Sequence, residues 1–483
     1  MKKIIAIVVL LSLVSVGAFW GISNIVSEEK ENVTIKENIL YGDKAYAEGV
    51  RVFTRVHYND HLFWNTAYTI GNTPKTTTTY EFHYSAYYEK NERRYDGLSL
   101  DLDLRYGFDL RKPVEECVGL QKAYRELFDE TTPGTTGTKT IRLQDYYTYY
   151  PIRVGMTLPG VLWNGNDYDN LTFDDYKNER AVWDKFNEFF KIPIPKDLPA
   201  FEISVTKNAI GNEVGMGSSG QDFEYWLNPQ VTYTNNRVFF SIGNKFYNRG
   251  KDSFQYVDTS LIPGGYGIYS FTYKNVRNSK NTQGNTTIFY PGYETGVEED
   301  TLAMVFPLEQ QAEVIYMTLS NDESKLLVFT KEYDVTYLTV IDIASMTEFQ
   351  KLKITETRQY TFYEYDNCIV LSGWEYISVI EKQPDGLCRL AFTVPRMKEV
   401  NDTNGQKGVD TVMAFDGNKL VMIDRTGDAE FYGLPICGFT VAVYNRTGLV
   451  YYGEYENSLS IATNPYDYSY NCLPVKYAVS ILK

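Results

Sequence analysis

Short stretches in which aromatic or β-branched residues alternate with polar ones recur along most of this chain. Two clear examples are YEFHYSAYY at 80–88 and VTYLTVIDI at 335–343. A period of two places successive side chains on opposite faces of a strand, so these stretches predict half-buried β-strands. The 42 tyrosines provide large side chains for the faces of such strands. We therefore expect an all-β body made of many short strands.

The clearest unit covers residues 313–354 and divides into four strands. Their expected bounds are 313–319, 325–331, 335–343 and 347–354. Four short antiparallel strands in about 40 residues are the repeat of one β-propeller blade.

A short motif in this unit resembles a known superfamily. SNDESKLLV at 320–328, followed by VIDI at 340–343, is similar to the S-P-D-G-x-x-L and V-x-D-L pattern of exported bacterial propellers of the TolB-like and YVTN-repeat kind. The match departs from that pattern at Asn321, where Pro is usual, and at Glu323, where Gly is usual. The resemblance implies a propeller fold and brings no activity with it.

Further units of four strands fit the same period. They are expected at 360–394 and at 410–455, and 49–106 forms a possible first blade. The final YAVSILK at 477–483 is a strand with no following partner. A last strand that completes the first blade is the usual way in which a propeller closes, and we expect that role here.

Two segments predict helices that interrupt the strands. One lies near 113–129, with Pro113 at a favourable first-turn position, and the other near 172–190. The second carries an apolar stripe at helical spacing, which predicts a face packed on the body. The stripe consists of Phe173, Tyr176, Val182, Trp183, Phe186, Phe189 and Phe190.

Composition also suggests a division of the chain. Residues 208–222 are rich in Gly and polar residues, and we interpret them as a loop between two halves. The predicted parts are an anchor or signal at 1–26, a linker at 27–48, an irregular β-rich half at 49–210 and regular blades at 211–483.

The N-terminus predicts export. Residues 4–22 form an apolar run without charge that Ser-Asn-Ile-Val extends to Val26, preceded by Lys2 and Lys3. This pattern favours a single-pass membrane helix with the N-terminus inside and the body extracytoplasmic. The alternative is a signal peptide cleaved after Ala18, which gives a secreted protein.

Charge and cysteine content exclude several classes. The formal net charge of −15 disfavours nucleic-acid binding, because phosphate backbones are anionic. The five cysteines are Cys117, Cys368, Cys388, Cys437 and Cys472. They are few and widely spaced, without a C-x-x-C pair, so they indicate neither a disulfide scaffold nor the common zinc sites.

The densest aromatic cluster is the candidate ligand site. It comprises Tyr146, Tyr147, Tyr149, Tyr150 and Trp163. Aromatic faces stack on sugar rings, which suggests a glycan, whereas alternate tyrosines on a strand are also ordinary cross-strand packing.

Two further clusters are candidate metal sites. Asn164, Asn166, Asp167 and Asp169 provide oxygen ligands of the type that calcium takes, although Asx residues before a helix also serve as turn and capping groups. His57 and His61 lie too far apart on one strand to share an ion unless the chain turns between them, and His83 is the third histidine. We expect no cofactor other than calcium.

The leading functional hypothesis is a membrane-tethered propeller that binds a protein or glycan ligand outside the cell and is not an enzyme. An exported glycan-active enzyme is the first alternative, with Asp101, Asp167 or Asp169 as its carboxylates. Asp103 lies on the same strand face as Asp101 and Arg105, which favours an ordinary solvated face. An accessory or sensor subunit of a cell-envelope complex is the second alternative.

Overall fold

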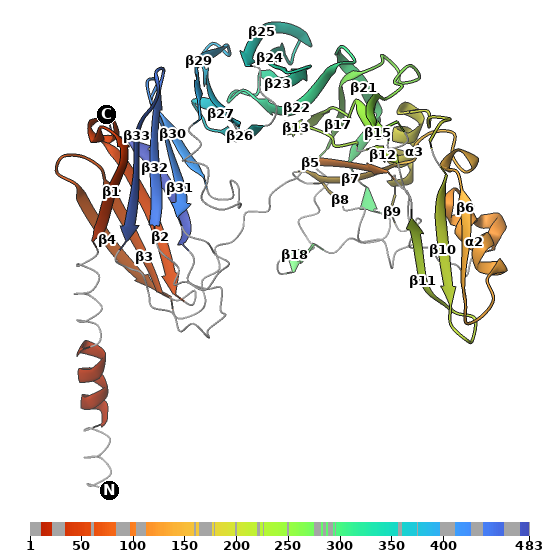
Figure 1. Ribbon diagram of the computed structural model, residues 1–483, viewed down its shortest axis with the longest axis horizontal. Helices are drawn as coiled ribbons and strands as arrows, with labels where there is room; N and C mark the ends of the chain where they lie inside the picture. The colour runs from red at the N-terminus through yellow and green to blue at the C-terminus, as the bar shows by residue number, and fades with distance from the viewer. Residues whose placement is uncertain are drawn as a thin grey trace. The chain divides into compact units, whose positions relative to one another are not determined.

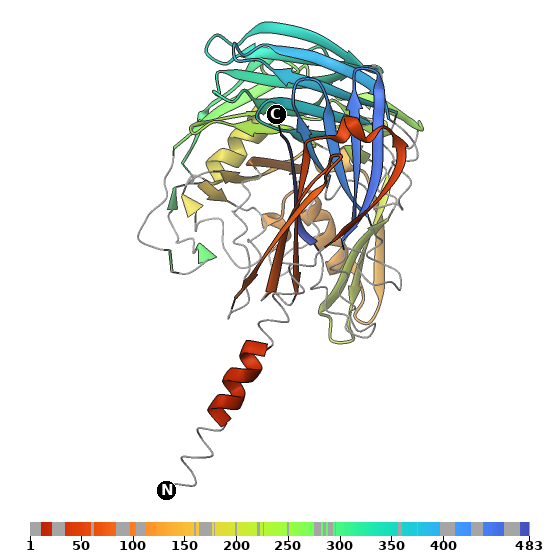
Figure 2. The ribbon, with the colours of Figure 1, turned by 90° about the vertical axis from the view of Figure 1, so that its left-hand side faces the viewer.

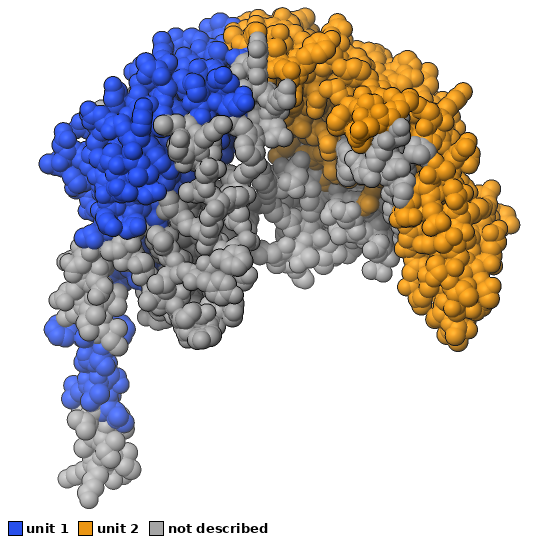
Figure 3. Space-filling model, in the orientation of Figure 1, with its two compact units in different colours: residues 1–92, 354–483 blue, residues 93–353 orange. Residues whose placement is uncertain are grey.

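Strands make up most of the residues that the structure describes, as the alternation predicts, and helices are few among these residues (Figure 1). The computed structural model describes residues 11–21, 34–58, 62–83, 97–102, 113–158, 161–163, 176–177, 179–198, 200–219, 223–225, 227–248, 251–274, 282–283, 286–287, 293–294, 296–355, 360–373, 375–396, 411–426, 438–457 and 474–482. The described chain divides into two compact units (Figure 3). Unit 1 comprises residues 1–92 and 354–483, and unit 2 comprises residues 93–353.

The described residues of unit 1 form three antiparallel sheets. Their strand orders are β34-β2-β3-β4, β26-β27-β28-β29 and β1-β33-β32-β31-β30. The strand bounds are β1 Ile35–Gly42, β2 Val50–Tyr58, β3 Leu62–Thr69, β4 Lys75–Phe82, β26 Tyr360–Glu364, β27 Cys368–Gly373, β28 Tyr376–Lys382, β29 Cys388–Pro395, β30 Val412–Phe415, β31 Leu420–Thr426, β32 Gly438–Asn445, β33 Gly448–Asn457 and β34 Pro474–Ile481. The strands expected in 360–394 and 410–455 are therefore present within a few residues of their predicted bounds.

The last strand of the chain, β34, pairs with β2. The two run antiparallel, with Val52 opposite Val479 and Val50 opposite Ile481. Val479 and Ile481 pack against a core that the β34-β2-β3-β4 sheet shares with the β1-β33-β32-β31-β30 sheet. The expected pairing of the C-terminal strand with the first sheet is thus found.

One strand of the expected first blade lies elsewhere. Segment 95–106 forms β5 (Gly97–Leu102), which pairs with β7 in unit 2 and not with β4. Leu98 and Leu100 are buried and Asp101 is exposed, as the alternation predicts. The alternation shows which face of a strand is buried, but it does not show which sheet the strand joins.

The segment expected as a linker at 27–48 contributes structure. β1 pairs with β33 over the length of the strand, and the 3-10 helix η1 (Lys44–Ala47) follows it (Figures 1 and 2). Glu37 of β1 lies between the sheets, where its carboxylate accepts hydrogen bonds from the hydroxyls of Tyr451 and Tyr455, both at 3.0 Å. Lys44 pairs with the same carboxylate. Glu37 and Lys44 of the expected linker are therefore partly buried partners.

In the part of unit 2 that the structure describes, five sheets of three or four strands combine with the α-helices α2 and α3. The orders are β5-β7-β8, β11-β10-β6, β12-β15-β16, β13-β14-β17-β21 and β22-β23-β24-β25. The bounds not yet given are η2 Val114–Glu116, α2 Leu120–Glu130, β6 Thr136–Ile141, η3 Leu143–Asp145, β7 Ile152–Leu158, β8 Val161–Trp163, β9 Tyr176–Lys177, α3 Glu179–Phe189, β10 Phe201–Lys207, β11 Glu213–Ser219, β12 Phe223–Tyr225, β13 Val231–Tyr233, β14 Arg237–Phe240, β15 Lys245–Asn248, β16 Ser253–Tyr256, β17 Gly267–Tyr273, β18 Thr282–Gln283, β19 Thr286–Thr287, β20 Tyr293–Glu294, β21 Val297–Pro307, β22 Ala312–Leu319, β23 Lys325–Glu332, β24 Val335–Asp342 and β25 Thr347–Thr355. The last four reproduce the unit predicted at 313–354.

The helices occupy the predicted regions but begin later. In the first region, Pro113 precedes the short helix η2, and Gly119 at φ +56° separates it from α2. In the second, α3 begins at Glu179, and Tyr176 lies in the two-residue strand β9. The predicted stripe is buried at Val182, Trp183, Phe186, Phe189 and Phe190, whereas Phe173 lies outside the described residues.

Two other expectations concern boundaries and the N-terminus. The loop expected at 208–222 contains β11, which pairs with β10, because strand pairing satisfies the backbone groups of a Gly-rich segment as well as those of any other. The boundary between the two halves, expected at residue 210, therefore falls inside the β10–β11 hairpin. Residues 11–21 are helical, and none of the described helices has the length and apolar character needed to span a membrane.

Removing β34 tests the pairing of the C-terminal strand. Deleting residues 474–483 exposes the edge of β2 and removes Val479 and Ile481 from the core. We expect loss of cooperative unfolding or aggregation, measured by calorimetry and light scattering. Deletion of Lys483 alone is the control; if both truncations melt like the full chain, the pairing does not support unit 1.

Candidate functional site

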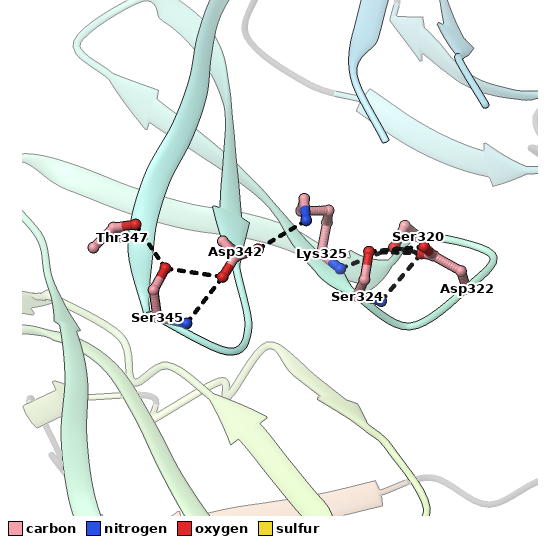
Figure 4. Close-up of polar contacts among 7 residues, drawn as sticks. All are labelled: Ser320, Asp322, Ser324, Lys325, Asp342, Ser345 and Thr347. Atoms are coloured by element: carbon pink, nitrogen blue, oxygen red, sulfur yellow. Dashed lines mark hydrogen bonds and ion pairs between the residues drawn. The ribbon is translucent and has the colours of Figure 1, made fainter. Parts of the chain in front are cut away.

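The two turns at one end of the β22-β23-β24-β25 sheet carry a polar hydrogen-bond network, and the sequence motif marks both turns (Figure 4). In the β22–β23 turn, the Asp322 carboxylate accepts hydrogen bonds from the Ser320 hydroxyl at 2.6 Å and the Ser324 amide at 3.1 Å. The Ser320 hydroxyl in turn accepts one from the Lys325 amide at 2.9 Å. Glu323 adopts a left-handed φ of +56° at the tip, where the motif usually has Gly.

The β24–β25 turn is built in the same way around Asp342. Its carboxylate accepts from the Ser345 amide at 2.9 Å and from the Lys325 ammonium at 2.8 Å. The Ile343 amide donates to the Ser324 carbonyl at 3.0 Å, which links the two turns. One lysine and one backbone hydrogen bond thus hold both turns in a fixed relation.

The electrostatics of these carboxylates determine their chemistry. Hydrogen bonds from Ser320 and Ser324 lower the pKa of Asp322 to about 2. The hydrogen bond from Lys325, with those from Ser345, holds the pKa of Asp342 far below its usual range. Both groups are therefore ionised acceptors near neutral pH and are poor proton donors. The arrangement suits rigid support of the turns better than acid–base catalysis.

Replacing Asp322 by Ala tests this support. The folded-state pKa is lowered, so the carboxylate stabilises the fold above its unfolded pKa of about 4 and loses this effect as the pH falls through about 2. We expect D322A to lower the melting temperature at pH 7 and the difference to shrink between pH 4 and pH 2. D322N keeps an acceptor for the Ser324 amide, so its melting temperature at pH 7 should fall less than that of D322A. Equal melting temperatures of D322A and the parent at pH 7 would contradict the proposed support of the turns by Asp322.

The predicted tyrosine cluster lies in unit 2 around η3. The Tyr147 hydroxyl accepts a hydrogen bond from the Leu120 amide at 3.0 Å, at the start of α2. Tyr150 is 2 % exposed, with its ring centroid 5.2 Å from that of Tyr225, and burial raises its pKa well above the usual range. Tyr146 and Tyr149 are half-buried.

Trp163, the fifth residue of this candidate site, ends β8. Tyr146, Tyr147 and Tyr149 are partly accessible, and Tyr146 and Tyr147 also pack against the core of unit 2. Ligand contact at this cluster stays a prediction.

The candidate metal ligands Asn164, Asn166, Asp167 and Asp169 lie outside the described residues. In the part of the chain that the structure describes, no group of three or more His, Cys, Asp or Glu side chains could hold a metal ion. His61 and Asp103 are likewise outside the described residues.

The remaining candidates occupy ordinary positions in sheets. His57 belongs to β2, whereas His83 follows β4, with its Nε2 3.6 Å from the Glu81 carboxylate. Asp101 of β5 occupies the position opposite Arg153 of β7.

Three cysteines are described, and each is buried: Cys117, Cys368 and Cys388. Burial raises the pKa of Cys368 to about 12 and that of Cys388 to about 11, which makes both thiols poor nucleophiles at neutral pH. Cys437 and Cys472 lie outside the described residues.

Sequence reasoning did not single out one aromatic group with two exposed rings and one half-buried ring, which we call the aromatic face. It consists of Tyr247 on β15 with Phe254 and Tyr256 on β16. Phe254 is 71 % exposed and Tyr256 48 % exposed. The alternation of FQY at 254–256 was the available signal, but it does not distinguish exposed from buried rings.

The chain was compared with known families, curated proteins and solved structures. No family model matches the chain, and no curated protein matches it. Among solved structures, a β-propeller domain of Cps50 (Swd1) from Myceliophteria thermophila has a TM-score of 0.22 and 9 % identity, covering 52 % of this chain and 69 % of that chain.

Two bacterial structures give similar values. A protein from Lactobacillus plantarum has a TM-score of 0.22 and 11 % identity, covering 60 % of this chain and 84 % of that chain. A putative 6-phosphogluconolactonase from Bacteroides uniformis has a TM-score of 0.22 and 12 % identity with the same coverages. TM-scores of this size do not establish a shared fold.

Proposed function

We propose that this chain is a β-propeller protein held at the outer face of a cell membrane, where it binds a protein partner through the turns at the ends of its sheets. The observation that carries the proposal is the pairing of β34 with β2 in one four-stranded antiparallel sheet. A strand from the chain end that completes a sheet begun near the N-terminus is the closure device of propellers.

The sheets around it support the same proposal. β22-β23-β24-β25 and β26-β27-β28-β29 are each four-stranded meanders in chain order, which is the topology of a blade. Propeller blades present their turns as rigid platforms, and proteins commonly bind partners with loops held by such a scaffold. The network around Asp322 and Asp342 fixes two neighbouring turns in this manner.

The proposed location comes from the sequence. The apolar run at 4–26 follows Lys2 and Lys3 and precedes the acidic segment that begins at Glu28, which favours an uncleaved anchor with the body outside. A net charge of −15 agrees with an extracytoplasmic protein-binding role rather than a nucleic-acid-binding one.

Protease accessibility tests the location. Protease added to spheroplasts should digest nearly the whole chain after Glu28 and leave a membrane-embedded N-terminal fragment, detected with an N-terminal tag. Lysed spheroplasts are the control for cleavage, and a cytoplasmic protein controls for leakage. Protection of the body in intact spheroplasts would refute the proposed topology.

Charge reversal at the turn tip tests partner binding. Glu323 is exposed at the tip of the β22–β23 turn, and E323K changes its charge without removing a side-chain group of the network. We expect E323K to reduce the yield of a partner cross-linked on intact cells, quantified by mass spectrometry. D334K, at the opposite end of the same sheet, is the matched control. Equal yields for both variants and the parent would place recognition elsewhere.

A further inference from the structure

We propose that the aromatic face of the β12-β15-β16 sheet is a glycan-binding site. This site is separate from the turns assigned to protein binding and does not depend on their role. The ligand class is a chain of pyranose sugars that stacks its C–H faces on Phe254 and Tyr256.

Strand register places the three rings on one face of the sheet. Tyr247 and Phe254 occupy opposite positions on β15 and β16, and their ring centroids lie 5.1 Å apart. Tyr256 is two residues beyond Phe254, so its side chain points to the same face, about 7 Å further along the strand. On the other face, Tyr225 and Phe246 are 4 % and 5 % exposed and belong to the core of unit 2. The sheet is therefore anchored on one side and presents rings on the other.

The exposure of these rings has a cost that ordinary packing does not explain. Single exposed apolar residues are normal on protein surfaces, but this face gathers a Phe at 71 % and a Tyr at 48 % exposure on adjacent outward positions. Burying an aromatic side chain normally stabilises a protein, and here about half or more of each of these two rings is left open to a ligand. Clusters of exposed aromatic residues mark binding surfaces.

Polar groups border the rings at positions where sugar hydroxyls need partners. The Tyr247 hydroxyl donates a hydrogen bond to the Asp252 carboxylate. Lys245 lies 5.6 Å from the Tyr256 ring centroid, and its ammonium is 3.2 Å from the Glu313 carboxylate. Carboxylates accept hydrogen bonds from hydroxyls, whereas the ammonium donates to ring and hydroxyl oxygens. The aromatic rings match the C–H faces of a pyranose, and the donors and acceptors at their edges match its hydroxyl groups.

The size of the face favours a sugar over a protein. β16 has four residues and the sheet has three strands. At 3.4 Å per residue and 4.8 Å per strand, the face measures about 200 Å². A standard protein interface needs about 800 Å² on each partner, so this face alone is too small for a stable contact with a second copy or another protein. A few sugar rings need no larger surface.

Affinity electrophoresis of the full chain in a detergent without sugar headgroups tests the proposal. Native gels would contain soluble β-1,4-glucan, β-1,4-linked N-acetylglucosamine polymer or α-1,4-glucan, each as a separate probe. We expect retardation by at least one probe and an apparent affinity about tenfold weaker in F254A, the loss of one stacked ring. F254Y and Y256F keep their rings and should bind nearly as the parent does.

The matched control is Y333A, which removes a tyrosine that is 81 % exposed on the β23–β24 turn of the same unit. It should be retarded like the parent, and melting curves should show that F254A is folded. Absence of retardation with all three probes would overturn the proposal, as would equal retardation of F254A and the parent. A dimer that F254A converts to a monomer in analytical ultracentrifugation would assign the face to a second copy instead. None of these outcomes alters the cross-linking result at Glu323, so the two proposals fail independently.

Discussion

The antiparallel pairing of β34 with β2 is the contact on which unit 1 depends. It pairs Val50 with Ile481, two residues that are far apart in the sequence. All of unit 2 lies between them in the sequence, because it is inserted between residues 92 and 354 of unit 1. The entropy cost of closing such a loop grows only logarithmically with its length, so the insertion is tolerable at equilibrium. Pairings between distant segments nevertheless form slowly, and until β34 arrives β2 presents an open edge. The β34-β2-β3-β4 sheet of unit 1 is therefore complete only when β34 has paired with β2.

The N-terminal strand β1 adds a second long-range connection of a different kind. Glu37 places a carboxylate between two sheets, a position that is costly unless its hydrogen bonds are satisfied. The hydroxyls of Tyr451 and Tyr455 donate to it, and Lys44 supplies the opposite charge. Removing Glu37 would leave the two tyrosine hydroxyls without this acceptor, and removing the tyrosines would leave the carboxylate without these donors. A shifted register of β1 would break the same contacts, so this cluster favours one register for β1 as well as stabilising the strand. β1 is thus fixed within unit 1 by side-chain contacts as well as by strand pairing.

Sequence periodicity predicted the strands better than their partners. The alternation in 313–354, 360–394 and 410–455 is local information, and in each segment consecutive strands pair, so local information sufficed. β5 has the same alternation but pairs with β7, about 50 residues later, and no pattern within 95–106 encodes that choice. Segment 208–222 was misjudged for a related reason, since the polar Gly-rich β11 is fixed by hydrogen bonds to β10 rather than by apolar burial. The candidate sites were harder still to predict from the sequence. Tyr150 and Tyr256 lie in similar aromatic-rich stretches, but Tyr150 is buried and Tyr256 is exposed, and only the tertiary structure decides this.

Three buried tyrosines of unit 2 use their hydroxyls as well as their rings. Tyr266, Tyr269 and Tyr273 bury their rings in unit 2, and each hydroxyl donates to a backbone carbonyl within 2.9 Å. A Phe in these places would fill the same space but leave that carbonyl with one partner fewer, whereas a Tyr satisfies it while packing. By the same reasoning an exposed position should prefer Tyr to Phe, because water can solvate the hydroxyl. Phe254 goes against this preference, with an exposed ring and no hydroxyl. An apolar ring there is useful only if something other than water lies against it.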